Sequence, residues 1–551
     1  MITTIPEQRI RIEKIKLQNF KGVSSGTVEF NCLRNPVEKE IQADLLGLYG
    51  QNGSGKTTLL EVLHVVKLAM MGKKIPCSKY GDIIAQGADF ARAEVQFQVR
   101  NADDSIYHVE YAFSLGRVTI STEQQPIKKN KSVVSKWVPV ITASAGVLAF
   151  LNPIATASMI GGAAIGTAAI TRVADIVGTG VITSKLAKST VEKFSKSDTT
   201  DSEEKLIVFN ETLSLSGMFN GNMVRFGPIF DASSNDVAFL PKARHKSFFP
   251  NKTTATLKEL QRYKGQILFD SRSFIFSDEI TQILLTEQLT EQNDIPEFAE
   301  LLLNLKEFAI NSLRVLDSRM IGISGDAKIF LYTASRGIGI RRSDSSTFLD
   351  DAGLQSLQTA LEGLNIVLKQ LIPGLSLEAV RQVDIDLNRN ERVHRTGTKV
   401  VVYSVRNNVR IPLTEESAGI LHLISALGLI SYAFANDGVT VAIDEIDAGV
   451  YEYLLGELLL VFEESGCGQL IFTCHNLRPL EVLDKKFVCF TTTNPDNRYL
   501  RPKNIRYENN LRKVYIQEII AGGQEEELYA SSKHGKIAAA LQKAGEIIGK
   551  E

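Results

Sequence analysis

Residues 50–57, with the sequence GQNGSGKT, match the pattern G-x-x-x-x-G-K-[ST] of a phosphate-binding loop. Glycines in this pattern let backbone N–H groups converge on phosphate oxygens, and the start of the following helix favours the anion. Lys56 is expected to neutralise the β- and γ-phosphates, and Thr57 is placed to bind Mg²⁺. The residues that we expect to contact the nucleotide here are Gly50, Asn52, Gly53, Ser54, Gly55, Lys56, Thr57 and Thr58.

A pair of carboxylates, Asp444 and Glu445, directly follows the apolar run at residues 439–443. Such a pair at a strand end can be a solvated turn, but together with a phosphate loop it indicates a hydrolytic site. We expect Asp444 to hold Mg²⁺, directly or through water, and Glu445 to activate the attacking water.

Other polar residues mark the starts and ends of neighbouring elements. Ser417 and Gly419 precede a helical pattern, where they can bind an anion or serve as an ordinary helix N-cap. Asp447 lies in a turn after the acidic pair, and His475 follows an apolar strand at residues 469–473. A histidine at the end of a strand in such a sheet is a candidate sensor of the γ-phosphate.

The separation of the motifs constrains the architecture. Lys56 lies near one end of the chain and Asp444 near the other, so both ends must build one nucleotide-binding domain. The residues between them must then loop out of it. A compact small GTPase or nucleotide kinase would not have this spacing.

The composition is that of an ordinary globular protein. The 551 residues include 62 Lys and Arg against 63 Asp and Glu, and 44% are hydrophobic, enough for two or more domains. These values exclude a basic nucleic-acid coat, an acidic tail and global disorder. The five cysteines contain no C-x-x-C pair, and residues 1–11 do not resemble a secretory signal, so we expect a reduced, cytoplasmic protein.

Hydrophobic periodicity predicts a mixed α/β chain. Alternating patterns predict strands at residues 10–20 and 27–30, and an antiparallel β subdomain at residues 93–99, 106–121 and 206–215. A strand at 44–49 and a helix at 57–71 flank the phosphate loop. Residues 279–315 have helical periodicity, and strands at 399–405, 439–443 and 469–473 alternate with helices at 416–434 and 451–464, which predicts a parallel sheet.

These patterns divide the chain into six segments. They are an N-terminal lobe with the phosphate loop (1–122), an apolar and basic insertion (123–203), a continuation of the β subdomain (204–250), a helical arm with a connecting segment (251–398), a C-terminal lobe (399–505) and a helical tail (506–551).

Residues 137–171 contain no charged side chain. This length would span a membrane, but the segment is rich in Gly, Ala, Ser and Thr and is interrupted by Asn152 and Pro153. We therefore favour a buried helical hairpin or a protein-contact surface, with membrane contact as the alternative.

The motifs together resemble the ABC-type ATPase heads of the SMC, RecF and OLD group. The residues that carry the resemblance are Asn19-Phe20-Lys21, the loop at 50–58, Glu416-Ser-Ala-Gly419, Ile443-Asp-Glu-Ile-Asp447 and Thr473-Cys-His-Asn476. The resemblance implies a P-loop head in which ATP and Mg²⁺ are sandwiched in a head-to-head dimer. Ser417 would contact the nucleotide of the opposing subunit, Asp447 would form the D-loop, and His475 would be the switch histidine.

The match to this group is incomplete. The signature reads Glu-Ser-Ala-Gly rather than Leu-Ser-Gly-Gly-Gln, and both Gln86 and Gln96 are candidates for the Q-loop. Too few residues follow His475 for the Toprim nuclease of OLD proteins.

A head with an arm but without its own nuclease resembles the PtuA-type ATPases of Septu and retron anti-phage systems. Residues 445–464, 476–481 and 497–499 strengthen this resemblance, which implies a separate HNH-type nuclease and, in retrons, a reverse transcriptase with RNA–DNA. The alternatives are a RecF- or SMC-like DNA-repair ATPase that clamps DNA, and a membrane-associated ATPase. Basic clusters at residues 128–136, 341–342 and 389–399 are compatible with nucleic-acid binding but also with solvated surfaces.

Overall fold

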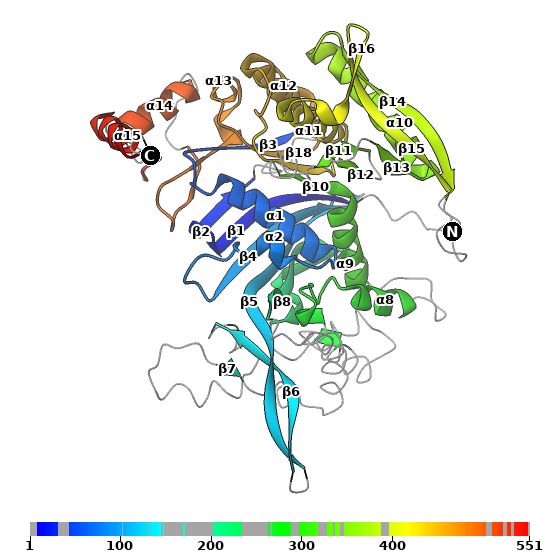
Figure 1. The fold of residues 1–551 in the computed structure, drawn as a ribbon, viewed down its shortest axis with the longest axis vertical. Helices are drawn as coiled ribbons and strands as arrows, with labels where there is room; N and C mark the ends of the chain where they lie inside the picture. Colours follow the sequence, from blue (N-terminus) through cyan, green and yellow to red (C-terminus); the bar gives the residue numbers. More distant parts are fainter. Residues whose placement is uncertain are drawn as a thin grey trace.

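The computed structural model of the chain contains several sheets and the helices that cover them (Figure 1). It describes residues 8–30, 43–101, 103–129, 132–144, 147, 169–170, 202–233, 260, 263–264, 267–287, 297–317, 328–333, 337–341, 346–386, 396–502, 510–521, 526–529 and 534–548.

A six-stranded, mainly parallel sheet forms the centre of the fold. Its order is β10 (Leu313–Leu316), β17 (Thr440–Ile443), β18 (Gln469–Thr473), β3 (Asp44–Tyr49), β19 (Val488–Thr491) and β20 (Tyr499–Leu500). All neighbours are parallel except β19 and β20. The two ends of the chain therefore build one sheet, which confirms the predicted assembly from both ends.

Helices cover both faces of this sheet. Helix α1 (Lys56–Met70) packs on the face to which Leu46 and Leu48 of β3 contribute, whereas Leu45 and Tyr49 belong to the core on the other face. The helices on that other face are α10 (Asp351–Leu371), α11 (Ala418–Ala435), α12 (Glu452–Ser465), α13 (Pro479–Val482) and α14 (Leu511–Ala521). Strands buried on both sides read as continuous apolar runs, which is why the sequence pattern identified β3, β17 and β18.

An antiparallel sheet packs against the outer side of α1. Its strands are β1 (Arg9–Phe20), β2 (Val23–Glu29), β4 (Phe90–Arg100), β5 (Ile106–Lys129), β6 (Ser132–Ala143), β7 (Ala169–Ile170), β8 (Glu203–Phe219) and β9 (Asn222–Ala232). The predicted β subdomain and its resumption are confirmed, because β8 pairs with β5. Strands β5 and β6 continue as a long hairpin that projects from the body (Figure 1).

His108 of β5 and Glu13 of β1 form an ion pair across the intervening strand β4. A bulge between Ile12 and Lys14 interrupts the register of β1 at Glu13, and His108 Nδ1 lies 2.7 Å from Glu13 Oε2. The hydrogen bond to Glu13 raises the pKa of His108 above its ordinary value of 6.5. The stabilising charge on His108 is therefore fully present below pH 6.5 and is lost as the pH rises through the raised pKa.

We expect His108→Gln to lower the free energy of unfolding more at pH 6 than at pH 8.5, by at most about 1 kcal/mol for such a partly exposed pair. Urea unfolding of both chains at the two pH values measures the difference. An equal cost at both pH values would contradict this role of the pair.

The described residues of the segment 251–398 form strands as well as the expected helices. It contains α8 (Asp278–Glu287), α9 (Glu297–Glu307) and the π-helix η2 (Phe308–Ser312), but also β10 of the central sheet. Strands β11 (Lys328–Tyr332) and β12 (Gly337–Arg341) form a hairpin, and β13 (Thr347–Leu349) and β14 (Leu375–Asp386) join a further sheet. Strands β10 to β13 have only three to five residues each and were hidden by the helical periodicity, whereas the 12-residue β14 was not predicted.

Strand β15 (Thr396–Arg406) does not belong to the parallel sheet as the sequence suggested. It pairs antiparallel with β13, β14 and β16 (Val409–Pro412). The two-residue turn at Asn407 and Asn408, both with positive φ, returns the chain as a hairpin instead of a helical crossover. The six segment boundaries stay a prediction.

The uncharged segment begins as strand and not as helix, since residues 137–143 lie in β6. Residues 148–168, and the basic positions Arg342, Arg389, Arg392, His394 and Arg395, lie outside the described residues. Within the described part, one helix, α11, is long and apolar enough to span a membrane. Its apolar residues are accounted for by its position, because 56% of that window is buried against the central sheet and α10.

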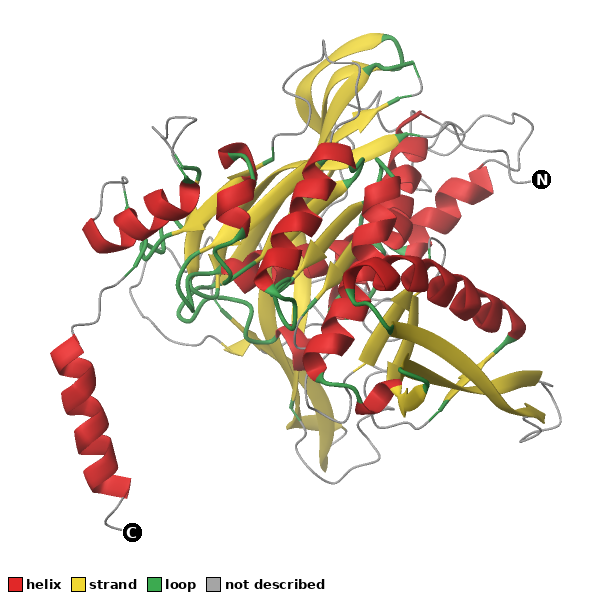
Figure 2. Cartoon of the chain, turned by 90° about the horizontal axis from the view of Figure 1, so that it is seen from above, coloured by secondary structure: helices red, strands yellow, loops and turns green. Residues whose placement is uncertain are grey.

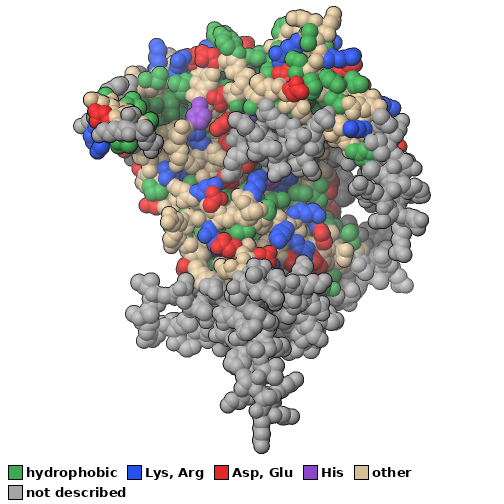
Figure 3. Space-filling model, in the orientation of Figure 1, with side chains coloured by type: hydrophobic (Ala, Val, Ile, Leu, Met, Phe, Trp, Pro, Cys, Tyr) green, Lys and Arg blue, Asp and Glu red, His purple; other side chains and the backbone are tan. Residues whose placement is uncertain are grey.

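Charged side chains of both signs are interspersed on the face shown in Figure 3. This distribution agrees with the formal net charge of −1. It gives no single basic surface there that would dominate an interaction with nucleic acid.

Candidate nucleotide-binding site

The loop at residues 50–55 connects β3 to α1, as predicted. Gly55 is the N-cap of α1 with φ 88°, a left-handed conformation that favours glycine. The buried Lys56 donates from Nζ to the carbonyl oxygens of Gly50 (2.6 Å) and Gln51 (2.9 Å). Its ammonium group thus lies over the loop, where phosphate oxygens would take the place of these carbonyls.

Side chains of strands β19 and β20 contact the phosphate loop and fix its conformation. Ser54 Oγ donates to Gln51 O at 2.7 Å and also contacts the hydroxyl of Thr491. Tyr499 donates to Gly55 O at 2.8 Å. Ser54 was predicted to contact the nucleotide, and in the structure its buried hydroxyl shapes the loop.

Asp444 lies at the end of β17 and meets Thr57 from the start of α1. Thr57 Oγ1 donates to Asp444 Oδ1 at 3.2 Å, although the two residues come from opposite ends of the chain. Thr473 of β18 donates to the same oxygen at 2.7 Å and accepts from the backbone N–H of Glu445 at 2.7 Å. Thr473 therefore positions both carboxylates, a role that the sequence pattern did not reveal.

These residues fit a Mg²⁺ site of the kind that nucleotides complete. Mg²⁺ usually takes one or two protein oxygens and otherwise water and substrate phosphates. The adjacent oxygens of Thr57 and Asp444 provide such a partial set. No group of three or more His, Cys, Asp and Glu side chains in the described part could hold a metal by itself.

Glu445 sits in a backbone turn with φ 52°, directly after the buried Asp444. Partial burial raises the pKa of Glu445 above its ordinary value, and the negative charge of Asp444 raises it further. His475 lies close enough to Glu445 for its charge to oppose this shift. A carboxylate with a raised pKa at the edge of a phosphate site is suited to accept a proton from water.

Asp447 connects the turn that follows Glu445 to the predicted switch residue His475 by hydrogen bonds. Its Oδ2 accepts from the backbone N–H groups of His475 (3.0 Å) and Asn476 (2.9 Å). The exposed His475 side chain is thereby oriented through its backbone. The structure thus brings Lys56, Thr57, Asp444, Glu445, Asp447 and His475 to one edge of the central sheet.

Ser417 is the N-cap of α11. Its exposed hydroxyl accepts a hydrogen bond from Ile420 N–H at 3.3 Å. Within one chain Ser417 therefore acts as an ordinary helix N-cap, which was one of the two predicted roles. Gly419 packs directly on Gly449, since a Cβ built on Gly449 would lie 2.3 Å from Gly419 Cα. The predicted signature and the turn after Asp447 therefore form one continuous edge.

The AAA-domain family description matches residues 14–313, which is more than half of the chain and includes the phosphate loop. The chain belongs to the AAA-domain family. It is an ATPase, with ATP as its nucleotide. No curated protein matches the sequence.

Solved structures similar to this AAA-domain protein include SMC heads and RecF. The Pyrococcus furiosus SMC head bound to the C-terminal domain of ScpA is 12% identical over 93% of this chain and 99% of that one, with a TM-score of 0.32. The Thermotoga maritima SMC head domain is 11% identical over 90% and 99%, with a TM-score of 0.30. The recombination mediator RecF with ATP is 11% identical over 85% and 94%, with a TM-score of 0.28.

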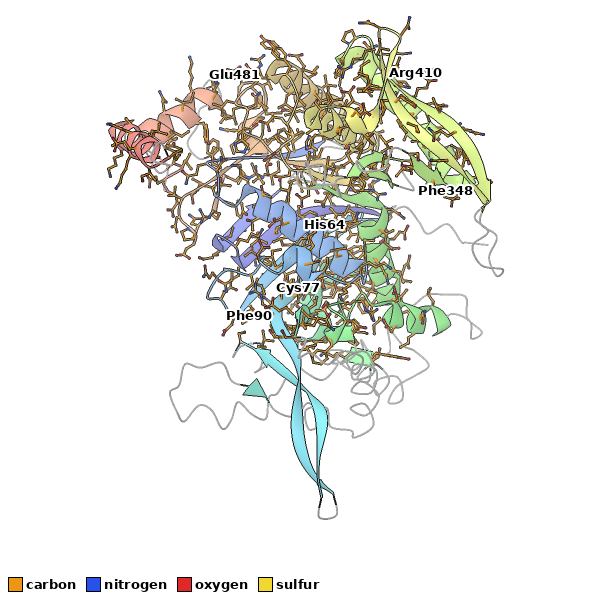
Figure 4. The ribbon with its side chains drawn as sticks, in the orientation of Figure 1. His64, Cys77, Phe90, Phe348, Arg410 and Glu481 are labelled. Atoms are coloured by element: carbon orange, nitrogen blue, oxygen red, sulfur yellow. The ribbon has the colours of Figure 1, made fainter. Side chains whose placement is uncertain are left out.

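Several side-chain contacts in this AAA-domain protein support the site, although the sequence pattern did not reveal them. His422 of α11 lies 3.0 Å through Nε2 from the carbonyl oxygen of Asp444, and burial lowers its pKa. Glu416 accepts from Ser404 at 2.6 Å and pairs with Arg406 at 3.3 Å, which links the signature segment to β15. Figure 4 shows Arg410 at the end of the β15–β16 hairpin that carries this link. A polar residue within an apolar helix, as His422 is, was the one available signal.

Gly449 is a position where even a methyl group should not fit. We expect Gly449→Ala to destabilise the protein by about 1–3 kcal/mol, because its φ of 74° disfavours Ala and the added methyl overlaps Gly419. Urea unfolding measures this loss. Gly438→Ala is the matched control, since nothing lies within 4 Å of a Cβ there. Equal stability of the two variants would contradict the close contact.

Proposed function

We propose that this protein is a cytoplasmic ATPase that dimerises head to head, with each ATP held between the phosphate loop of one copy and Ser417 of the other. The observation that supports this best is the continuity of the exposed edge with the catalytic residues. Gly419, two residues after Ser417, packs on Gly449, and Asp447 of that turn binds the backbone of His475. A second copy that docks on this edge would therefore affect the position of His475.

Thr57 and Asp444 would hold Mg²⁺, which neutralises phosphate charge when it is bound. The positive charge of Lys56 stabilises the negative charge that develops on the β- and γ-phosphates. Glu445 takes a proton from the attacking water while the water oxygen bonds to the γ-phosphorus. The bond between the γ-phosphorus and the bridging oxygen of the β-phosphate breaks at the same time. The products are ADP and inorganic phosphate.

Mixing two defective chains tests the shared site. Lys56→Met removes a chain's own phosphate site but keeps its Ser417, whereas Ser417→Arg blocks the signature but keeps the phosphate site. A mixed dimer has one intact composite site, so mixing should restore part of the ATPase activity that each variant lacks alone. Activity of Ser417→Arg equal to the parent chain, or no recovery on mixing, would contradict the proposal. Thr359→Arg, on an exposed position of α10, is a control for the added charge.

We further propose that the ATP-driven dimer controls a partner nuclease in anti-phage defence. The resemblance of residues 445–464, 476–481 and 497–499 to PtuA-type ATPases supports this output. ATP would favour one assembly state and hydrolysis another, so the nuclease would respond to a population shift. The second candidate is a DNA-repair clamp, which the shared motifs of SMC- and RecF-type heads also support.

Affinity purification of the tagged chain from its native operon distinguishes the two outputs. The defence proposal expects a stoichiometric HNH-type nuclease, with or without a reverse transcriptase and structured RNA–DNA. An ATPase that co-purifies only with bulk DNA would overturn it in favour of the clamp. The Lys56→Met chain, purified in parallel, shows whether retention depends on ATP.

A further inference from the structure

The C-terminal helix α15 (His534–Ile548) stands apart from the other helices and sheets (Figure 2). Residues 535–548 are all exposed, including Ile537 (44%), Leu541 (69%) and Ile548 (75%). A helix of this length without packing partners is marginal in water, because tertiary contacts provide most helical stability. The exposed apolar side chains therefore need a cover that the described part of this chain does not provide.

The apolar residues of α15 form a single stripe. Ile537, Leu541, Ala544 and Ile548 follow one another at intervals of four, three and four residues, the spacing at which one helix pairs with another. Ala540 and Ile547 flank the stripe on one side, and Ala538 and Gly545 flank it on the other. The charged residues Lys536, Lys543 and Glu546 lie on the rest of the circumference.

We propose that α15 pairs antiparallel with α15 of a second copy of this chain. In that register Ile537 lies opposite Ile548 of the second copy, and Leu541 lies opposite Ala544, so a large residue meets a small one at the centre. The flanks then bring Ala540 to Ile547 and Ala538 to Gly545 of the second copy, so that no charged group is enclosed. A parallel pair would instead place Ala544 opposite Ala544 and leave a gap beside Leu541.

Self-pairing is favoured over a different partner because the stripe is complementary to itself under a two-fold axis. Two helices of this length form a contact smaller than a stable interface requires. The pair would thus act as a weak link that raises the effective concentration of the heads for each other. It does not depend on ATP, so it goes beyond the proposed head dimer and can fail or hold independently of it.

Cysteine cross-linking of the full-length chain, without nucleotide, tests the pairing. A chain with Ile537→Cys is mixed with a chain carrying Ile548→Cys and oxidised, and we expect a mixed disulfide in high yield. Lys543→Cys on the polar side of α15 is the matched control, and the unsubstituted chain reports any background from Cys77 and Cys467, which are partly exposed. Adding Leu541→Glu to both cysteine chains should abolish the mixed disulfide.

The proposal would be overturned if the yield of the mixed disulfide between Ile537→Cys and Ile548→Cys were no greater than the disulfide yield of the Lys543→Cys control. A higher yield for Ile537→Cys with itself than for the mixed pair would also overturn it, because that outcome indicates a parallel arrangement or another contact. The ATPase activity of the Leu541→Glu chain, measured on the same samples, shows that the head is folded. If the mixed disulfide forms but ATP does not cause dimerisation, the proposed head dimer is wrong and the pairing of α15 still holds.

Discussion

Glu445→Gln should lower kcat for ATP hydrolysis by about 10²–10⁴-fold while ATP still binds, because a general base contributes a factor of that size. The amide keeps the shape of the carboxylate but cannot accept the proton from water. The backbone N–H of Glu445 still reaches Thr473 Oγ1, so the turn and the position of Asp444 are preserved. Steady-state phosphate release and equilibrium ATP binding measure the two effects separately.

Glu464→Gln is the matched control for this change. Glu464 is exposed near the end of α12, and its replacement should leave kcat unchanged. Hydrolysis by Glu445→Gln at the parent rate would remove Glu445 from the reaction. A loss of ATP binding together with kcat would instead assign Glu445 to binding the nucleotide.

Lys56→Met should weaken ATP binding by about 10²-fold or more, because hydrogen bonds to charged groups contribute about 1.5–3 kcal/mol each. The buried Nζ of Lys56 already points to the loop carbonyls of Gly50 and Gln51, the place where phosphates would bind. Burial lowers the pKa of Lys56, and the nearby carboxylates of Asp444, Asp447 and Glu445 oppose this shift. Isothermal titration with ATP and Mg²⁺ measures the affinity.

The control for Lys56→Met is Lys74→Met, at an exposed position after α1. It changes the net charge by the same amount but should bind ATP as the parent does. Equal affinities for the Lys56→Met chain and the control would show that the nucleotide binds elsewhere.

Strands β3, β17 and β18 of the central sheet were predictable because their hydrophobic patterns are strong, whereas β19 and β20 were not predicted. Runs such as residues 44–49 and 439–443 are apolar on both faces, and the phosphate loop has a fixed spacing. The path of β15 was not predictable, because its run of three valines at residues 400–402 resembles a buried parallel strand, although β15 pairs antiparallel. Strand β10 was also missed, since four residues after the helical pattern of α9 and η2 carry too little periodicity.

The sequence pattern named the residues that are expected to touch phosphate, and these roles stay predictions, whereas it did not reveal the residues that position them. Thr57 and Asp444 were predicted to share one metal, and the structure places their oxygens 3.2 Å apart. Thr473 and His422 act through hydrogen bonds to groups that are distant in the chain, and no local pattern encodes such contacts. The roles of Ser417 and His475 at the nucleotide, and the identity of the Q-loop residue, stay predictions.

The mass of the Glu445→Gln chain in solution, with and without ATP, tests the shared ATP site most directly. The chain should also carry Leu541→Glu, so that α15 does not contribute to association. Light scattering should then give a monomer without nucleotide and a dimer with saturating ATP and Mg²⁺, and Ser417→Arg should return the monomer. A chain that binds ATP fully and yet stays monomeric would contradict the account.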